Sequence, residues 1–423
     1  MRATPVDAGP SVRTRAGALR WIRTAGPTLI SASSDIDPTS IGALAVIGST
    51  VVYGLNWLVL AIVPLLAAEL MLATRIGLVS EQGLQKLVRR RFAPVWSWAA
   101  LATFVVVNII TLGADIGAGA AAVGLFFHGR AAFFVIPFAL GTGLLLQFGT
   151  YRMLKRVLLW LLLAFLAYVA SAFAAHPDWA AALHDTVVPQ FHWNSDYIGG
   201  AIAIIGGTMT GYVYLWQTIE EASERRSLRA MRREEMAAPI GVAWTTMIGI
   251  FILIATGSTL GQHGVRATTA AQAAQALRPI AGSASTYLFA VGLFGSAALA
   301  LPVLAGTTAS AVAETLGWRE GVDQPMERRA VPFYAVLWVS IALGAAIPLF
   351  GFPAISLLFY GSIVGAVGLP LQLALLALIA RDREVMGEHR AGVVVTAFGW
   401  CAVAVATGAF GLLVFRLLVH GGI

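Results

Sequence analysis

Apolar residues recur in long runs along almost the whole chain, and polar residues are largely confined to short stretches between them. A run of about 20 apolar residues forms a helix long enough to cross the roughly 30 Å hydrocarbon core of a membrane. We expect about eleven transmembrane helices. They lie near 26–49, 53–73, 95–124, 131–149, 154–175, 197–219, 237–260, 284–314, 331–350, 353–380 and 392–418. The pattern therefore predicts an all-α integral membrane protein.

The composition agrees with this pattern. Of the 423 residues, 58% are hydrophobic and only 12% are charged, against about 25% charged in ordinary soluble domains. The single cysteine, Cys401, is too few for a disulfide framework or a cysteine-based metal centre. The chain has no serine nucleophile elbow and no Walker loop, and no soluble domain interrupts the spans. We expect a transporter rather than an enzyme, with no cofactor.

The basic residues predict the orientation, because Lys and Arg in short loops are retained on the cytoplasmic side. With residues 1–20 as a cytoplasmic tail, the inner segments carry nearly all of the 28 Lys and Arg residues. Those that fall outside are Arg130, Arg266, Arg278 and Arg416. We expect a cytoplasmic N-terminus and an external C-terminus in a bacterial-type inner (plasma) membrane. The net charge of +7 then reflects contact with anionic membrane lipid and no nucleic-acid partner.

The first span contains two acids and a proline, in the stretch SSDIDPTS. An acid at bilayer depth costs about 2.5–3.5 kcal/mol on insertion scales, so it normally faces a watery pathway or a partner. Pro38 removes a backbone donor and disfavours helical geometry at Asp37, which predicts a helix break. Asp37, the Ser40 hydroxyl and the freed carbonyls are the oxygen ligands that hard cations prefer. The alternative is a simple proline kink with incidental acids.

A second break is predicted in the sixth span, AIIGGTMTGYVYLWQ, where Gly206, Gly207 and Gly211 surround Thr210. Spans one and six are five apart, as two inverted repeats of five helices require. Small residues also mediate close packing of membrane helices, so the glycines become informative only beside the first break. We expect one transporter domain over 21–423. It comprises repeat one near 26–175, repeat two near 197–380 and an extra helix near 392–418.

At these residues the chain resembles the Nramp (natural resistance-associated macrophage protein) family of divalent-metal transporters. The segments GPTLISASSDIDPTS and YGLNWLVLAIVPLLAAELMLATRIGLVSEQGL resemble helices one and two of that family, NIITLGADIGAGAAAV helix three, and GGTMTGYVYLWQTIEEASER helix six. VLAGTTASAVAETLGWREG and the segment ending in ARDREVMGE resemble helices eight to ten. The resemblance implies a leucine-transporter-like 5+5 inverted repeat with broken helices 1 and 6, and transport of divalent metal cations.

Two motifs depart from the usual Nramp pattern. Typical members carry Asp-Pro-Gly-Asn, whereas Ser40 stands here in the place of the asparagine. Typical members also carry Met-Pro-His in helix six, where this chain reads Met209-Thr210-Gly211. Either Met209 keeps the sulfur ligand or Thr210 takes its place. The spacing TxxGY…WQ…E resembles the Nramp-related magnesium-transporter branch and favours Thr210.

The resemblance places the transported cation between the two breaks. The candidate metal ligands are Asp37, Thr210, Asp35, Asp115, Ser40, Met209, Gln217 and Asn108. Asp35 either completes the vestibule or draws cations inward by its field. Mg²⁺ sheds its waters reluctantly, so its site is wide and lined by oxygens, whereas a thioether selects softer metals. We therefore expect Mg²⁺ and/or Mn²⁺ as the transported divalent cation.

Proton coupling is a separate question. All seven histidines lie in loops or near chain ends, so no imidazole is available inside the membrane to titrate near neutral pH. We expect uptake without proton coupling, with Asp115 as the only substitute proton carrier. Two alternatives stay open: a proton-coupled Mn²⁺/Fe²⁺ symporter, and a transporter of amino acids or other organic solutes with the same fold. The sequence leaves the oligomeric state open.

Overall fold

The computed structural model describes residues 37–148, 166–224, 231–318 and 331–420, and every regular element in these ranges is a helix. The helices within the apolar spans are α3 (Pro38–Val51), α4 (Asn56–Ala61), α5 (Val63–Ser80), α7 (Pro94–Phe127), α8 (Ala132–Phe148), α11 (Ser195–Thr208), α12 (Gly211–Glu224), α13 (Met231–Thr259), α16 (Ser285–Leu316), α17 (Val331–Leu349), α18 (Ala354–Gly365), α19 (Leu369–Ile379) and α21 (Val393–His420). The shorter helices between spans are α6 (Leu84–Arg91), α10 (Trp179–Val187), α14 (Ala270–Ala274), α15 (Arg278–Ala281) and α20 (Arg383–Met386).

The described helices account for the predicted spans. Among the described residues, seven stretches are long and apolar enough to cross a membrane, and the bent pair α18 and α19, at 49°, makes an eighth. The helices α3 and α8 are shorter apolar helices. Only the span expected near 154–175 lies largely outside the described residues, which include its end as a helix at 166–174. The protein is a multi-pass, all-α integral membrane protein, as the hydrophobic pattern predicts.

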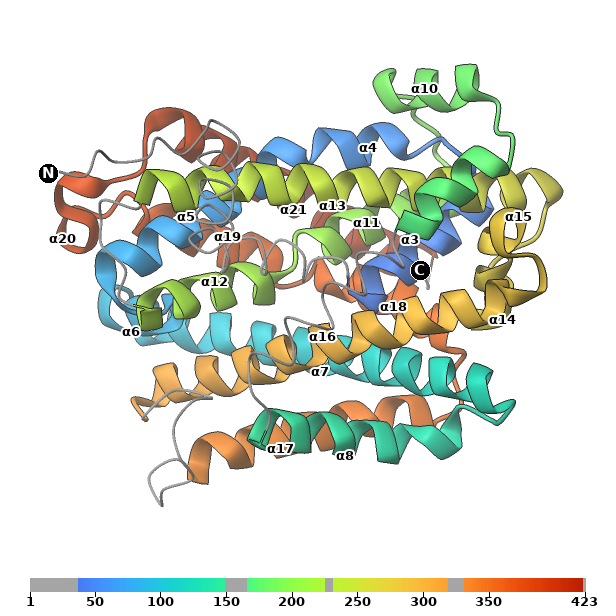
Figure 1. Cartoon of the computed structure of the whole chain (residues 1–423). Coiled ribbons are helices and arrows are strands. Elements are labelled where there is room, and N and C mark those ends of the chain that lie inside the picture. The colour runs from blue at the N-terminus through green and yellow to red at the C-terminus, as the bar shows by residue number, and fades with distance from the viewer. Residues whose placement is uncertain (1–36, 149–165, 225–230, 319–330, 421–423) are drawn as a thin grey trace, which may run out of the picture.

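The short helices gather at two opposite ends of the bundle (Figure 1). At one end, called the α6 end, α6 and α20 meet through Arg91, whose Nε lies 2.9 Å from Asp382 Oδ2. Burial acts to raise the pKa of the Asp382 carboxyl, but hydrogen bonds from the Glu384 N–H and from Arg91 outweigh it and hold this pKa below its ordinary value. The opposite end, the α10 end, carries α10, α14 and α15. Loops predicted inside and loops predicted outside thus lie at opposite ends.

The helix that carries the first predicted break lies inside the bundle. Helix α3 packs against α11, α13 and α18, and also contacts α7. Helix α7 packs along α16 and α17, and with α8 these form the lower group of helices in Figure 1. A single hydrophobic core cluster connects residues from Ile41 to Leu413. Helix α3 is therefore enclosed by neighbouring helices.

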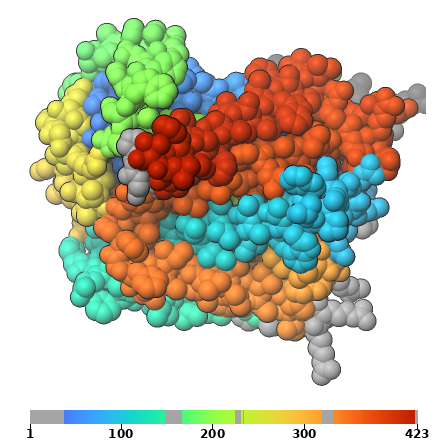
Figure 2. All heavy atoms as spheres, turned by 180° about the vertical axis from the view of Figure 1, so that it is seen from behind, coloured from blue at the N-terminus to red at the C-terminus, as the bar shows by residue number. Residues whose placement is uncertain are grey.

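The last helix lies on the outside. Only 28% of the most apolar 18-residue segment of α21 is buried. The corresponding segment within Ser195–Ser223, the stretch that contains α11 and most of α12, is 78% buried. Figure 2 shows α21, coloured red, across the surface of the molecule. An apolar helix with so much exposed surface is suited to contact lipid, whereas α11 and α12 are placed to build a site in the interior.

Candidate functional site

Helix α3 begins at the first break that the sequence predicts. Asp37 is its N-cap, Pro38 occupies the first turn, and Asp37 Oδ1 accepts a hydrogen bond from the Ser40 N–H at 2.6 Å. Proline suits this position because the first helical N–H groups have no intrahelical acceptor. Asp37 is only 1% exposed. Asp35 and the first half of the predicted span lie outside the described residues, so the carboxylate that the structure places at this break is Asp37.

The second break separates α11 from α12. Helix α11 ends at Thr208 with Met209 as its C-cap, Thr210 is not helical, and α12 begins at Gly211. The Met209 N–H still bonds Ile205 O at 3.0 Å. The position agrees with the prediction from the sequence, and two helix ends meet inside the bundle.

Hydrogen bonds join the two breaks. The Ser40 hydroxyl donates to Gly207 O at 2.9 Å, so α3 binds a carbonyl in the last turn of α11. The Tyr212 hydroxyl at the start of α12 donates to Asp37 Oδ2 at 3.1 Å. One carboxylate oxygen of Asp37 therefore caps its own helix and the other contacts the second broken helix. Backbone carbonyls at a mid-membrane break need such partners or an ion.

A second carboxylate adjoins this junction from α7. Asp115 is fully buried, and its Oδ1 accepts a 2.6 Å hydrogen bond from the Thr39 hydroxyl. Its Oδ2 has no hydrogen-bond partner among the described residues. Because a buried, unpartnered carboxylate oxygen is costly, Asp115 is suited to face a cation.

Thr210 is the residue at the second break with a free oxygen. Its Oγ1 is buried without a hydrogen-bond partner in the described part of the chain. It lines a small cavity together with Thr39, Asn108, Tyr212 and Ser362. Asn108 also donates from Nδ2 to Thr308 Oγ1 at 3.0 Å, and its amide oxygen is of the type that binds a cation.

Met209 and Gln217 have different surroundings. The Met209 side chain is fully buried in the hydrophobic core cluster. Gln217 lies two turns along α12, where its Nε2 donates to Thr74 Oγ1 at 3.1 Å and to Glu221 Oε1 at 2.8 Å. The structure therefore brings Asp37, Ser40, Asp115, Asn108 and Thr210 together, and places Gln217 in a separate polar cluster.

Two contributors were missed by the sequence reasoning. Tyr212 holds the second oxygen of Asp37. Ser362 of α18 donates to Leu358 O at 3.0 Å and to Thr39 O at 3.3 Å, behind the start of α3. A tyrosine after a break could have been noted, but a serine in an apolar helix carries no local signal of its role.

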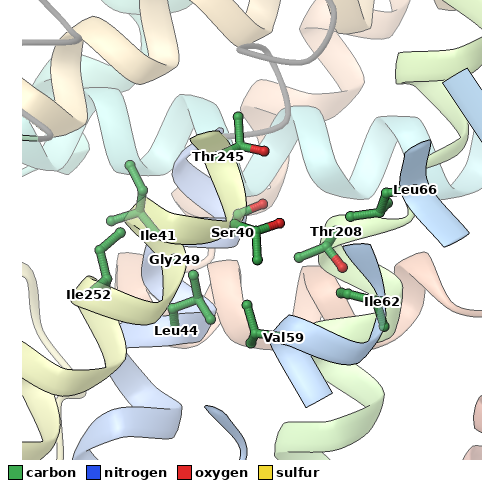
Figure 3. Close-up of a pocket in the computed structure, with 11 residues that line it drawn as sticks. Ser40, Ile41, Leu44, Val59, Ile62, Leu66, Thr208, Thr245, Gly249 and Ile252 are labelled. Atoms are coloured by element: carbon green, nitrogen blue, oxygen red, sulfur yellow. The ribbon is translucent and has the colours of Figure 1, made fainter. Parts of the chain in front are cut away.

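A further pocket lies beside the junction, between α3, α4, α5, α11 and α13. Figure 3 shows Ser40, Thr208 and Thr245 among apolar side chains such as Leu44 and Val59. Three helices, α3, α11 and α13, therefore each contribute a hydroxyl to a pocket wall that is otherwise mostly apolar. Within the described ranges no three His, Cys, Asp or Glu side chains are grouped to hold a metal ion. Two carboxylates with neutral oxygens form a site suited to transient binding rather than a rigid metal centre.

Comparison with known proteins identifies the family. The family model described as "Natural resistance-associated macrophage protein-like" matches residues 28–416. The chain belongs to the Nramp family. Among curated Nramp relatives, the "Divalent metal cation transporter MntH" of Deinococcus radiodurans is 26% identical, over 97% of this chain and 94% of the relative. The protein of the same name from Mycobacterium tuberculosis is also 26% identical, over 94% and 92%.

Solved structures confirm the fold. The manganese transporter of Eremococcus coleocola superimposes with a TM-score of 0.76 at 17% identity, covering 96% of this chain and 88% of that one. MhsT, solved in complex with L-phenylalanine, gives a TM-score of 0.61 at 15% identity, covering 92% and 98%. The expectations of Nramp membership and of a leucine-transporter-like fold are confirmed. The names of these relatives agree with a transporter rather than an enzyme.

Proposed function

We propose that this Nramp protein transports divalent metal cations, Mg²⁺ and/or Mn²⁺, by alternating access through a site between the two helix breaks. The observation that carries the proposal is the hydrogen bond from Tyr212 to Asp37, which ties the start of α12 to the N-cap of α3. A cation at Asp37 would thus contact both broken helices at once. Its binding would stabilise one arrangement of the two helices over another, as a transport cycle requires.

The charges at the junction favour a cation over an organic solute. Asp37 and Asp115 contribute carboxylates, and the other described side chains of the junction are neutral. An amino-acid carboxylate needs helix N-termini free of negative charge, whereas the N-terminus of α3 is already occupied by Asp37. The curated relatives are named divalent metal cation transporters, which supports the same conclusion.

The oxygen-rich lining supports a hard metal. Carboxylate, hydroxyl and carbonyl oxygens suit Mg²⁺ and Mn²⁺, and a thioether suits softer ions. Thr210 has a free oxygen in a cavity, while Met209 is buried in the hydrophobic core. The proposal therefore assigns Thr210 to the cation and keeps the magnesium-transporter branch as the expected relative.

We also propose uptake without proton coupling, driven by membrane potential. Histidine is the side chain that ordinarily titrates near neutral pH, and His128, His263 and His389 lie at helix ends or in short turns rather than at the junction. Among the described carboxylates of the junction, Asp115 is the one with an oxygen that has no hydrogen-bond partner. The alternative of a proton-coupled symporter therefore rests on Asp115.

The test is uptake into proteoliposomes loaded with a metal-sensitive dye and a pH probe. Asp37→Asn should lower Mg²⁺ and Mn²⁺ uptake about a hundredfold, equivalent to roughly 2.7 kcal/mol, because the charge that holds the cation is lost. Asparagine is as good an N-cap as aspartate, so α3 should still form. Binding of Mn²⁺ to the detergent-solubilised protein should fall in parallel.

The matched control is Asp178→Asn at the exposed N-cap of α10, where Asp178 accepts from the Ala181 N–H at 3.0 Å. This control has the same chemical change and should leave uptake unaltered. Unchanged uptake in Asp37→Asn would place the site elsewhere. Metal entry could instead be accompanied by internal acidification that disappears in Asp115→Asn. That result would contradict the uncoupled mechanism and show proton symport.

A further inference from the structure

Glu69 is a buried acid that the junction described above does not use. It lies in the second turn of α5, is 3% exposed, and its Oε1 has no hydrogen-bond partner among the described residues. A carboxylate at this depth in a membrane is costly unless a partner or a water-filled path is at hand. Glu69 therefore needs an explanation beyond packing.

The residues around Glu69 include two hydroxyls and a phenol. Glu69 lines a small cavity with Thr208, Thr210 and Tyr214, between apolar side chains of α5, α12 and α13. The Thr208 hydroxyl donates to Ile204 O at 2.6 Å, and Tyr214 OH donates to Gln372 Oε1 at 3.2 Å. Their protons are thus engaged elsewhere, and the hydroxyl oxygens remain as acceptors.

No described cation neutralises Glu69. The basic residue on the same helix, Arg75, donates from Nη2 to Glu235 Oε2 at 2.8 Å and from Nη1 to Arg390 O at 2.9 Å. That pair joins α5 to α13 between one and two turns closer to the α6 end than Glu69. A cavity with one acid and several acceptor oxygens, and no fixed positive charge among the described residues, is suited to a mobile cation.

The Glu69 cavity adjoins the junction. Thr210 lines both this cavity and the one that contains Asn108 and Tyr212. Thr208 lines both this cavity and the pocket that contains Ser40, and Figure 3 shows Ser40 and Thr208 on the same pocket. Because Tyr214 lies beyond the break along α12, the Glu69 cavity is on the side of the junction that faces the α6 end.

We propose that Glu69, with the oxygens of Thr208 and Thr210, forms a second station that holds the divalent cation between the junction and the α6 end. The inference rests on the proposed transport function and adds a step to it. A cation that leaves Asp37 keeps an anionic partner while it crosses the apolar wall made by α5 and α13. Glu69 then acts on the rate of transfer and not on the first binding event.

The first test separates binding from turnover. Glu69→Gln should keep Mn²⁺ binding to the detergent-solubilised protein within about twofold of the unmodified protein and lower uptake about tenfold, a loss confined to the transfer step. Asp37→Asn, measured beside it, should lose binding as well. Unchanged uptake in Glu69→Gln would overturn the second station and leave the proposed function intact. Unchanged uptake in Asp37→Asn would instead contradict the proposed function itself.

The second test excludes a purely structural acid. Glu69→Cys in a Cys401→Ser background should make Mn²⁺ uptake about tenfold more sensitive to Cd²⁺, because a thiolate binds soft metals tightly. Bound Cd²⁺ should also slow the reaction of this thiol with a methanethiosulfonate reagent. The matched control is Met71→Cys, on the same helix but not on the cavity wall. Equal Cd²⁺ sensitivity in the two variants, or none in either, would show that Glu69 does not contact the cation.

Discussion

Asp37 performs two tasks with one carboxylate. Its Oδ1 caps α3 through the Ser40 N–H, and its Oδ2 accepts from Tyr212 across the junction. The sequence predicted a helix break at Asp37 from the proline that follows it, but it did not predict the first task, the N-cap. The second depends on α12 lying beside α3, which no local pattern in the chain encodes.

Thr210 gives the sharpest prediction at the residue scale. Thr210→Met puts a thioether in place of a hydroxyl that has no hydrogen-bond partner in the described part of the chain, so competition by Cd²⁺ against Mg²⁺ or Mn²⁺ uptake should strengthen about tenfold. The measurement is the Cd²⁺ concentration that halves uptake in proteoliposomes.

The control for this prediction is Met209→Leu. Leucine conserves the volume of this fully buried side chain and removes the sulfur, so Cd²⁺ competition should not change. A loss of Cd²⁺ competition in Met209→Leu, with no gain in Thr210→Met, would assign Met209 to the metal and support the ordinary transition-metal pattern.

At the scale of the elements, the close contact of α11 and α18 fixes the junction. A Cβ at Gly206 would lie 2.1 Å from Ser362 O, and one at Gly365 would lie 2.2 Å from Gly206 O. These distances leave no room for a methyl group, and the nearest atoms belong to the backbone, which cannot rotate away. The two glycines therefore allow the last turn of α11, including Gly207 O, to approach Ser40.

Gly206→Ala tests this contact. The added methyl group should push α11 from α18, destabilise the protein by about 1–3 kcal/mol, and lower uptake because Gly207 O moves away from Ser40. Thermal unfolding in detergent and uptake in proteoliposomes measure the two effects.

Gly199→Ala is the matched control in the same helix. A Cβ there meets no atom closer than 3.6 Å, at Arg416 Nη1, so both stability and uptake should be close to those of the unmodified protein. If the two glycine variants behave alike, close packing at Gly206 is not what positions the second break.

The positions of these helices could be predicted from the sequence, but their contacts with one another could not. The apolar runs, and the proline and glycines that interrupt them, predicted where α3 begins and where α11 gives way to α12. Glycine alone does not say which backbone it faces, since small residues serve any close helix contact. That α18 is the partner, and that Ser362 lies behind Thr39, required the tertiary structure.

At the scale of the whole molecule, the distribution of basic residues predicts which end faces the cytoplasm. Helix α6 carries Arg89, Arg90 and Arg91 in its last turn and lies at the end opposite α10 and α14. Basic residues in short loops are retained inside. We therefore expect the α6 end to be cytoplasmic and the α10 end external.

Cysteine labelling in intact cells checks this orientation. In a Cys401→Ser background, Thr268→Cys at the α10 end should react with a membrane-impermeant maleimide, and Glu384→Cys at the α6 end should react only after the cells are permeabilised. Both positions are exposed, so the membrane and not burial decides access. If Glu384→Cys is labelled in intact cells and Thr268→Cys is not, the protein has the opposite orientation.

The sequence by itself determined the membrane class, the spans, the two breaks and the acids at them. These features follow from local physics: apolar runs seek the bilayer, proline ends a helix, and a buried acid needs a partner. Only the tertiary structure decided which oxygens meet. The Asp37 to Tyr212, Asp115 to Thr39 and Ser40 to Gly207 bonds join residues far apart in the chain, and the free oxygens of Thr210 and Glu69 are known only once every neighbouring donor has been assigned. Contacts of that kind depend on how whole helices pack, and the pattern along one helix does not specify its neighbours.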